Sequence, residues 1–371
     1  MIWIAAIALL FGALTALLAW LFLRTRNKRK HRRMNTKEHY VSKALIKRFA
    51  NEQNRIERFK LEFGKWDTTA PKAVFKAIGY NQLLAFGTFD DSLDVTFKEL
   101  EQVLPKTLDA LDDIAANGSK LLTADIFEHL CWYCAFIWHM CPFKKAVSQL
   151  DFTMQLDLDL KSGKVDMLKA IGIKDSHIEV LQKHHAEGNK SVIVGKHYLQ
   201  MVYRIQFRQN CEWTHKQFKH YTKWTVYNSP IELPISDHAL IQYQLNKAIV
   251  SVLPISPTSV LIGICALGEN LPPSTDTTIG SSSLTKIEAE CIRDTICASA
   301  QLAIASKTRI GDINAFRKSA AEHGITFLRI KNVQAVLSAG EKAIESELEF
   351  GILTVKAGGF KEFADSILSR P

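Results

Sequence analysis

The spacing of apolar positions changes twice along the chain. Residues 37–50 have the spacing of a short helix, and residues 56–64 then place Phe59, Leu61 and Phe63 in strand-like alternation. Residues 72–80 are the candidate partner strand. From residue 92 to about residue 210 the spacing is helical. Within this helical part, Pro105 is expected to kink or divide one helix, and residues 123–142 are apolar nearly all round, which predicts the most buried helix of the fold.

Beyond Trp213 the pattern becomes β-branched and short. The predicted strands cover residues 223–228, 231–236, 248–256 and 259–267, followed by a polar loop at 268–283. Residues 285–306 return to a helix whose expected buried face carries Ile287, Cys291, Ile296 and either Ile292 or Thr295. The tail holds two more strand candidates around a helix. The predicted class is α+β, with an N-terminal single transmembrane helix and a helical block followed by a mostly antiparallel sheet.

The transmembrane prediction rests on residues 1–23, which contain no charged side chain. A helix of that length reaches roughly 33 Å, enough to cross a bilayer core. Trp3 and Trp20 stand near its ends, where indole rings favour the membrane interface. A cleaved signal peptide is the alternative, but the positive charge follows the apolar run instead of preceding it. A buried core helix is the other alternative, and an apolar run of this length without a polar face disfavours it.

Seven cations follow between residues 24 and 33 and account for most of the net charge of +9. The positive-inside rule predicts that this cluster, and the body after it, are cytoplasmic, with the N-terminus outside the inner membrane. Residues 1–33 are therefore expected to contact the lipid bilayer, with the basic cluster on anionic headgroups. The odd number of cysteines, seven, agrees with reduced thiols in a cytoplasmic body.

Several short motifs are similar to those of a bacterial family known as domain of unknown function 4238. They are "HYV" and "FA" near residues 39–50, "KWTVYNSPIELPISD", "LPISP" and a closing "ASAQLAIAS". The resemblance covers about residues 37–306 and implies no established chemistry. Ser42, Ala239 and Arg293 depart from the family pattern. The predicted organisation is a transmembrane helix at 1–23, a basic linker at 24–36, an α+β domain at 37–306 and a small α/β extension at 307–371.

A metal site is not predicted, although Cys131, Cys134, His139 and Cys141 share one helix. Cys131 and Cys141 would lie about 15 Å apart along the helix axis, too far for one tetrahedral zinc ion. The surrounding residues are aromatic and aliphatic, which favours core packing. No cofactor can be named from the sequence.

Residues 196–224 mix cations with aromatic residues, a combination suited to single-stranded nucleic acid. The candidate binding residues are Arg204, Arg208, Lys216, Lys219 and Lys223. The alternative, which we favour, is that the aromatic residues belong to the core and the cations form a solvated side.

The candidate catalytic residues are His39 and Asp237. His39 precedes an amphipathic turn and has the side chain most often used as a general base. Ser236, Asp237 and His238 interrupt an otherwise apolar stretch, so Asp237 is expected either to orient His39 or to bind a cation. The alternative is a local turn in which these side chains bond their own backbone. Both stretches match the short motifs of the family that the chain resembles.

Two functions follow from these observations. The first is a membrane-anchored hydrolase or nuclease-like effector acting at the inner face of the membrane. The second is a non-catalytic, membrane-tethered module that binds a partner or senses a ligand. The familiar nucleotide-binding, zinc-protease and serine-hydrolase motifs do not occur in the chain, so the sequence does not decide whether the protein is an enzyme.

Overall fold

The computed structural model describes residues 37–78, 83–85, 88–90, 92–145, 158–163, 165–166, 169, 175–187, 196–245, 248–266, 276–325 and 327. The strands are β1 (Lys37–His39), β2 (Ile56–Lys60), β3 (Lys65–Thr69), β4 (Lys76–Ile78), β5 (Leu83–Ala85), β6 (Thr88–Asp90), β7 (Lys120–Leu121), β8 (Thr222–Asn228), β9 (Ile235–Ser236), β10 (Ile241–Leu245), β11 (Ala248–Ser256), β12 (Ser259–Ala266), β13 (Thr278–Ser283) and β14 (Ala303–Ser306). The helices are α2 (Lys43–Lys47), η1 (Pro71–Ala73), α3 (Ser92–Asn117), α4 (Ala124–Met140), α7 (Asp175–Ala186), α9 (Lys196–His220), α10 (Lys286–Ser299) and α11 (Ile313–Glu322).

A six-stranded sheet in the order β10-β11-β12-β8-β13-β7 forms the centre of the fold. All its pairs are antiparallel except β13 with β8, which run parallel. A second, antiparallel sheet has the order β3-β2-β14-β9. Strand β2 from the start of the described chain therefore pairs with β14 near its end, so the second sheet joins residues that are far apart in sequence.

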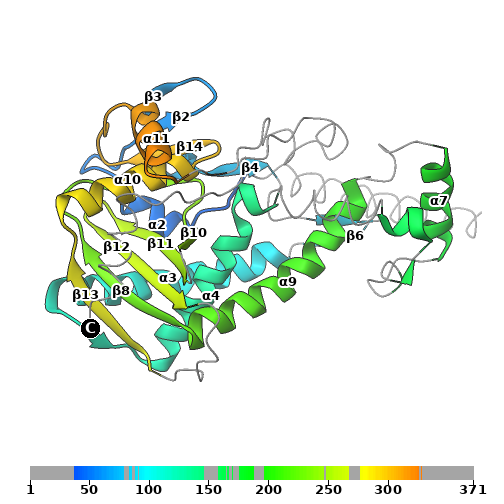
Figure 1. Cartoon of the computed structure of the whole chain (residues 1–371), viewed down its shortest axis with the longest axis horizontal. Coiled ribbons are helices and arrows are strands. Elements are labelled where there is room, and N and C mark those ends of the chain that lie inside the picture. The colour runs from blue at the N-terminus through cyan, green and yellow to red at the C-terminus, as the bar shows by residue number, and fades with distance from the viewer. Residues whose placement is uncertain are drawn as a thin grey trace, which may run out of the picture.

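Helices cover both faces of the central sheet (Figure 1). Neighbouring residues of a strand point to opposite faces, and Leu261 of β12 packs with α3, α4 and α9, whereas Val260 and Ile262 pack with α10. Helix α9 runs along the first face and continues away from the sheet toward α7 (Figure 1). The result is three layers with the sheet in the middle.

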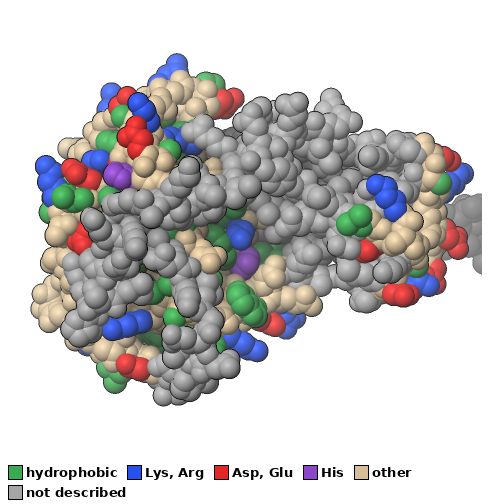
Figure 2. Space-filling view, in the orientation of Figure 1, with side chains coloured by type: hydrophobic (Ala, Val, Ile, Leu, Met, Phe, Trp, Pro, Cys, Tyr) green, Lys and Arg blue, Asp and Glu red, His purple; other side chains and the backbone are tan. Residues whose placement is uncertain are grey.

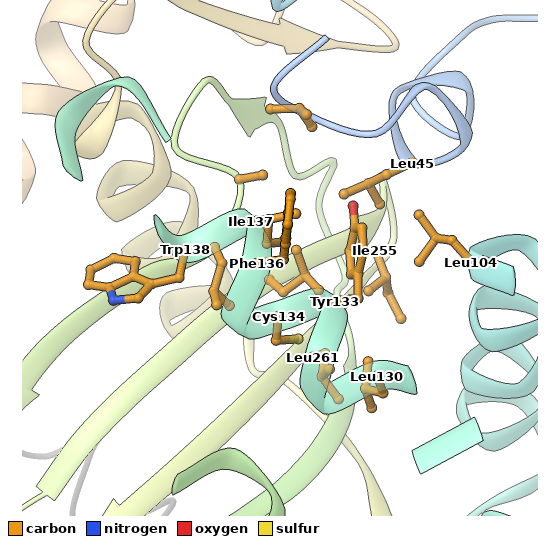
Figure 3. Close-up of a cluster of buried hydrophobic side chains, with 14 of the residues drawn as sticks. Leu45, Leu104, Leu130, Tyr133, Cys134, Phe136, Ile137, Trp138, Ile255 and Leu261 are labelled. Atoms are coloured by element: carbon orange, nitrogen blue, oxygen red, sulfur yellow. The ribbon is translucent and has the colours of Figure 1, made fainter. Parts of the chain in front are cut away.

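The largest buried cluster surrounds α4 (Figure 3). Tyr133, Phe136 and Ile137 lie among Leu45 of α2, Leu104 of α3 and Ile255 of β11, as the apolar run in the sequence predicts. Trp138 lies to one side of these residues and points away from them (Figure 3). Trp138 and His139, at this end of α4, also line the pocket described in the next section.

The predicted fold class needs correction. The α+β class with a helical block and sheets is confirmed, but no helix within the described ranges is both long and apolar enough to cross a membrane. The predicted fold class is therefore wrong in including a membrane-spanning helix. The residues on which that prediction rested, 1–23, lie outside the described chain, as does the basic linker at 24–36.

The predicted order of elements also changes. Strands β1 to β6 precede the helical block, and β2 and β3 form part of a sheet with strands from the other end of the chain. Strand β2 pairs with β3, not with residues 72–80, because a tight turn at residues 61–64 brings β3 back beside it. Phe63 falls in that turn and is exposed. Strand β4 pairs with β1 instead.

Helix α3 continues through Pro105 without a break. Its buried residues Leu104, Leu108 and Leu111 pack in the main core, and such packing outweighs the hydrogen bond that proline removes. The helix predicted to end at residue 306 ends at Ser299, and residues 303–306 form β14. Ile287 is 74% exposed, so the predicted buried face of this helix was wrong there; Ala289, Ile292 and Ile296 are buried.

Candidate functional site

A pocket lies between the end of α4, the last part of α9 and the central sheet. We call it the central pocket; its volume is about 320 Å³. Its lining residues are Trp138, His139, Lys144, Asn210, Trp213, Thr214, Gln217, Phe218, Thr222, Gln242, Ile249, Ser251 and Cys265. The volume lies within the range of small-molecule sites, which combine apolar walls with a few polar groups. The central sheet supplies one wall, formed by residues of β8, β10, β11 and β12.

His139 occupies the last turn of α4 and joins the two helices across the pocket. Its Nε2 and the hydroxyl of Thr214 on α9 share a hydrogen bond of 2.8 Å. Burial, with a smaller contribution from Lys144, lowers the pKa of His139 to about 4, and the backbone carbonyl of Asn210 opposes the change. The imidazole is therefore neutral at pH 7 and offers hydrogen bonds without charge.

The ring of Trp138 contacts a histidine and a lysine. Its ring stacks on His238 with 5.2 Å between ring centroids and an interplanar angle of 14°. The Nζ of Lys144 lies 4.4 Å from the Trp138 ring centroid, a cation–π arrangement. His238 is 3% exposed, its Nε2 has no hydrogen-bond partner among the described residues, and burial lowers its pKa to about 3. His238 is thus an uncharged packing partner behind the pocket wall.

The remaining lining residues include both polar and apolar side chains. Gln242 Nε2 donates to Ser251 Oγ at 3.0 Å, and the Cys265 thiol donates to Gln217 Oε1 at 3.9 Å. Trp213 is 61% exposed although it is a large apolar side chain. Exposed indole at the rim of a cavity is available to stack on a ligand. None of the described lining residues is acidic.

Asp237 directly follows β9 of the second sheet and is fully buried. Its Oδ1 accepts from the backbone N–H of Gln301 at 3.0 Å and its Oδ2 accepts from that of Leu302 at 2.9 Å. Burial raises its pKa to about 7, while these backbone donors oppose the rise. The carboxylate therefore fastens the chain between α10 and β14. The charge of Asp237 also contributes to raising the pKa of Tyr40, for which burial is the larger cause.

Ser236 forms the local turn that was the alternative for this stretch. Its hydroxyl donates to the carbonyl of His238 at 3.1 Å and accepts from the His238 N–H at 3.2 Å. The same hydroxyl lies 3.3 Å from that of Ser299 at the end of α10. The break in the apolar pattern therefore marks a turn tied to a distant helix end.

His39 closes strand β1 beside β4. Burial, with smaller contributions from Lys76 and Lys43, lowers its pKa to about 4, and the carbonyl of Val74 opposes the change. The groups that shift the pKa of His39 therefore belong to nearby segments of the chain. The carboxylate of Asp237 instead accepts hydrogen bonds from the connection between α10 and β14. The pairing of His39 with Asp237 stays a prediction.

The five candidate nucleic-acid residues differ in their surroundings. Arg208 pairs with Glu212 at 3.0 Å, and Lys219 pairs with Glu128 at 2.7 Å. Lys216 and Lys223 are exposed on α9 and β8, and the side chain of Arg204 lies outside the described part. Figure 2 shows acidic and basic side chains interspersed on the visible face. Ion pairs with neighbouring acids reduce the cationic character of this segment.

The cysteines of α4 are packed in the core. Cys131, Cys134 and Cys141 are buried free thiols, and burial raises the pKa of each. Within the described ranges no group of three His, Cys, Asp or Glu side chains is placed to hold a metal ion.

A second, more open groove of about 380 Å³ lies at the end of α2, beside the β11–β12 turn. Its charged residues are Arg48, Glu232 and Lys307. Arg48 pairs with Asp112, and Glu232 accepts from the amide and hydroxyl of Thr308. Because two of its three charges are already engaged, this groove is a weaker candidate than the central pocket.

The central pocket could not be identified from the sequence. Its residues come from α4, the turn after it, α9 and four strands, so no local motif brings them together. One signal was available: Trp138, His139 and Lys144 place polar or amphipathic groups at the end of an otherwise apolar helix.

No family model, curated protein or solved structure matches this chain. The resemblance to the domain-of-unknown-function 4238 family over residues 37–306 therefore stays a prediction.

Proposed function

We propose that the described domain is a non-catalytic binding module that holds a small molecule in the central pocket. One observation carries the proposal: a neutral His139, a cation at Lys144 and an exposed Trp213 surround a single cavity of ligand size. Such cavities bind ligands by apolar burial and use a few polar groups for orientation. The alternative, a hydrolase, rests on the pairing of His39 with Asp237, whose carboxylate is engaged with backbone amides.

The binding test uses phenylacetamide, a neutral molecule with one aromatic ring and one amide. Calorimetric titration of the full-length protein should give saturable binding with a dissociation constant in the range of about 0.1–10 mM, as expected for so small a ligand. Trp213→Ala should weaken this binding roughly tenfold, because stacking on an aromatic ring contributes about 1 kcal/mol or more. Trp213→Phe should retain most of the affinity.

Tyr221→Ala is the matched control, because Tyr221 is an exposed aromatic residue at the end of the same helix that does not line the pocket. It should leave the affinity unchanged. Absence of saturable binding, or an equal loss in Trp213→Ala and Tyr221→Ala, would reject the binding function. Turnover of bis(p-nitrophenyl) phosphate that disappears in His39→Ala would favour the hydrolase instead.

A further inference from the structure

Two glutamine side chains line the central pocket, and each has more hydrogen-bonding groups than it uses within the described chain. Gln242 Nε2 donates to Ser251 Oγ at 3.0 Å, which leaves the Oε1 acceptor and one N–H of Gln242. Gln217 Oε1 accepts from the Cys265 thiol at 3.9 Å, which leaves both N–H groups of the Gln217 amide. Both glutamines are half-buried, so these remaining groups are available to a ligand in the cavity.

A stacking surface lies one helical turn from Gln217. Trp213 and Gln217 are four residues apart on α9, so their side chains lie on the same face of the helix. Gln242 comes from β10, where its neighbours Ile241 and Tyr243 pack with α10 on the other side of the sheet. The pocket therefore combines the exposed indole of Trp213 with donors and an acceptor from two different elements.

This combination suits a flat ligand with hydrogen-bonding groups on its edge. A ring of carbon atoms alone would take the amide groups of Gln217 and Gln242 out of water without pairing them, which costs free energy. A glutamine amide holds its acceptor and its donors in one plane, and such an amide pairs with the amino group and N7 of adenine. Nucleobases also stack on indole rings. The cavity of about 320 Å³ lies in the size range of small-molecule sites.

We propose that the central pocket binds a free purine base of the adenine type, whose ring stacks on Trp213, whose amino group donates to Gln242 Oε1 and whose ring nitrogen accepts from Gln217 Nε2. This inference rests on the binding function proposed above and adds the chemical class of the ligand. It assigns stacking to α9 and recognition of the amino group to β10.

A base within single-stranded nucleic acid presents the same edge. Binding of a strand also requires cations along its phosphate backbone. On α9, however, Arg208 pairs with Glu212 and Lys219 pairs with Glu128. Part of the positive charge on the helix that lines the pocket is thereby neutralised, which favours a free base over a strand.

Calorimetric titration of the full-length protein with adenine and with purine at pH 7 tests the proposal. Purine has the same ring system without the amino group, and both molecules are uncharged at this pH. Adenine should bind roughly fivefold more tightly than purine, a difference that corresponds to one net hydrogen bond. Trp213→Ala should weaken the binding of both ligands by the same factor, because stacking does not depend on the amino group.

Three substitutions on β10 test the role of Gln242. Gln242→Met keeps an unbranched side chain but has only a weak acceptor, so it should remove the preference for adenine and leave the affinity for purine within about threefold. Gln242→Glu keeps an acceptor oxygen for the amino group, so the preference should persist in it. Gln244→Met is the matched control, because Gln244 is exposed on the same strand and does not line the pocket. It should leave both affinities unchanged.

The outcomes distinguish this proposal from the one on which it rests. Equal affinity for adenine and purine would overturn the purine-base assignment, while saturable binding of phenylacetamide would keep the binding function in place. A preference that survives in Gln242→Met, or that is lost equally in Gln244→Met, would also overturn the assignment. A single-stranded oligodeoxyadenylate that binds more than tenfold more tightly than adenine would overturn the choice of a free base. If adenine, purine and phenylacetamide all fail to bind, both proposals fall.

Discussion

The carboxylate of Asp237 accepts the backbone N–H of Leu302 at 2.9 Å, across 65 positions of sequence. Its other oxygen accepts the N–H of Gln301. Together these bonds tie the turn after β9 to the connection between α10 and β14, and β14 then pairs with both β9 and β2. Asp237 is therefore a structural link between the adjacent strands β9 and β14 of the second sheet.

Asp237→Ala should destabilise the protein by about 2–4 kcal/mol, because two backbone donors would lose their partner in a largely buried site. Asp237→Asn keeps one acceptor oxygen and should cost less. Urea-induced unfolding followed by circular dichroism measures both. Asp276→Ala is the control, since the exposed Asp276 accepts from the nearby Thr278 N–H, and it should cost about 1 kcal/mol or less. An Asp237→Ala protein as stable as the control would show that these two bonds contribute little.

The stability of His238→Phe relative to the unaltered protein should rise progressively as the pH falls. The pKa of His238 is lowered to about 3 in the folded protein by burial and by Lys144, whereas an ordinary histidine titrates near 6.5. Below pH 6.5 the unfolded chain therefore binds a proton at this position that the folded chain does not bind, so the stability that His238 contributes above pH 6.5 is lost as the pH falls. Phenylalanine has no such proton.

The measurement is the difference in unfolding free energy between His238→Phe and the unaltered protein at pH 7 and pH 5. This difference should shift by about 2 kcal/mol in favour of phenylalanine. A constant cost from the larger ring would not alter the shift. Phe143→Leu changes the same stack, where the Phe143 and His238 ring centroids lie 5.7 Å apart, and its effect should not depend on pH. A pH-independent difference for His238→Phe would disprove the prediction.

Much of the fold could be predicted where the pattern is local. The apolar run 123–142 indicated α4, and the β-branched runs indicated β8, β11 and β12. Strand β13 was missed because "TIGSSS" has the composition of a loop. The segment becomes a strand by pairing with β8, which is far away in the sequence. Strand β14 was missed because "AIAS" consists of small residues that also continue a helical pattern. In both cases long-range pairing outweighs local preference.

The start of α10 explains why Ile287 was wrongly predicted to be buried. The helix begins with a capping box in which Thr285 and Glu288 satisfy each other's backbone N–H groups. That start leaves Ile287 on the solvent side, and the buried face follows Ile292 and Ile296. Likewise, the break at residues 236–237 could be seen in the sequence, but neither Ser299, which lies against the Ser236 hydroxyl, nor Gln301, which donates to Asp237, could be identified, because only tertiary structure brings them near.

Removing Lys216 and Lys223 should change the salt dependence of nucleic-acid binding very little. If both lysines lay on a shared binding surface, their removal would lower the slope of log affinity against log salt by about 1.4–1.8. We expect the double variant Lys216→Gln, Lys223→Gln to lower this slope by less than about 1. Fluorescence anisotropy with a labelled single-stranded oligonucleotide measures the slope. The control removes Lys72 and Lys286, two exposed lysines elsewhere. A drop of about 1.4 or more that is specific to the first pair would establish residues 196–224 as a nucleic-acid surface.

Gly263→Ala should destabilise the protein and weaken ligand binding together. Gly263 of β12 lies opposite Trp224 of β8, and an added Cβ would stand 2.5 Å from Cζ3 of that indole. Trp224 is fully buried, and its Nε1 donates to the carbonyl of Phe218 at 3.1 Å, so the ring has little room to move. The expected loss is about 1–3 kcal/mol, as for other overpacked cores.

A shift of Trp224 would also reach the central pocket, because Phe218 lines it. Affinity for phenylacetamide should therefore fall in Gly263→Ala under conditions in which the variant remains folded. Gly280→Ala is the comparison, since its Cβ would stand 3.0 Å from Oγ1 of the half-buried Thr225, and a hydroxyl side chain gives way more easily than a buried indole. Equal losses of stability in the two variants, measured by urea unfolding, would mean that β12 can move away from Trp224; unchanged affinity in Gly263→Ala would mean that Phe218 is positioned independently of that contact.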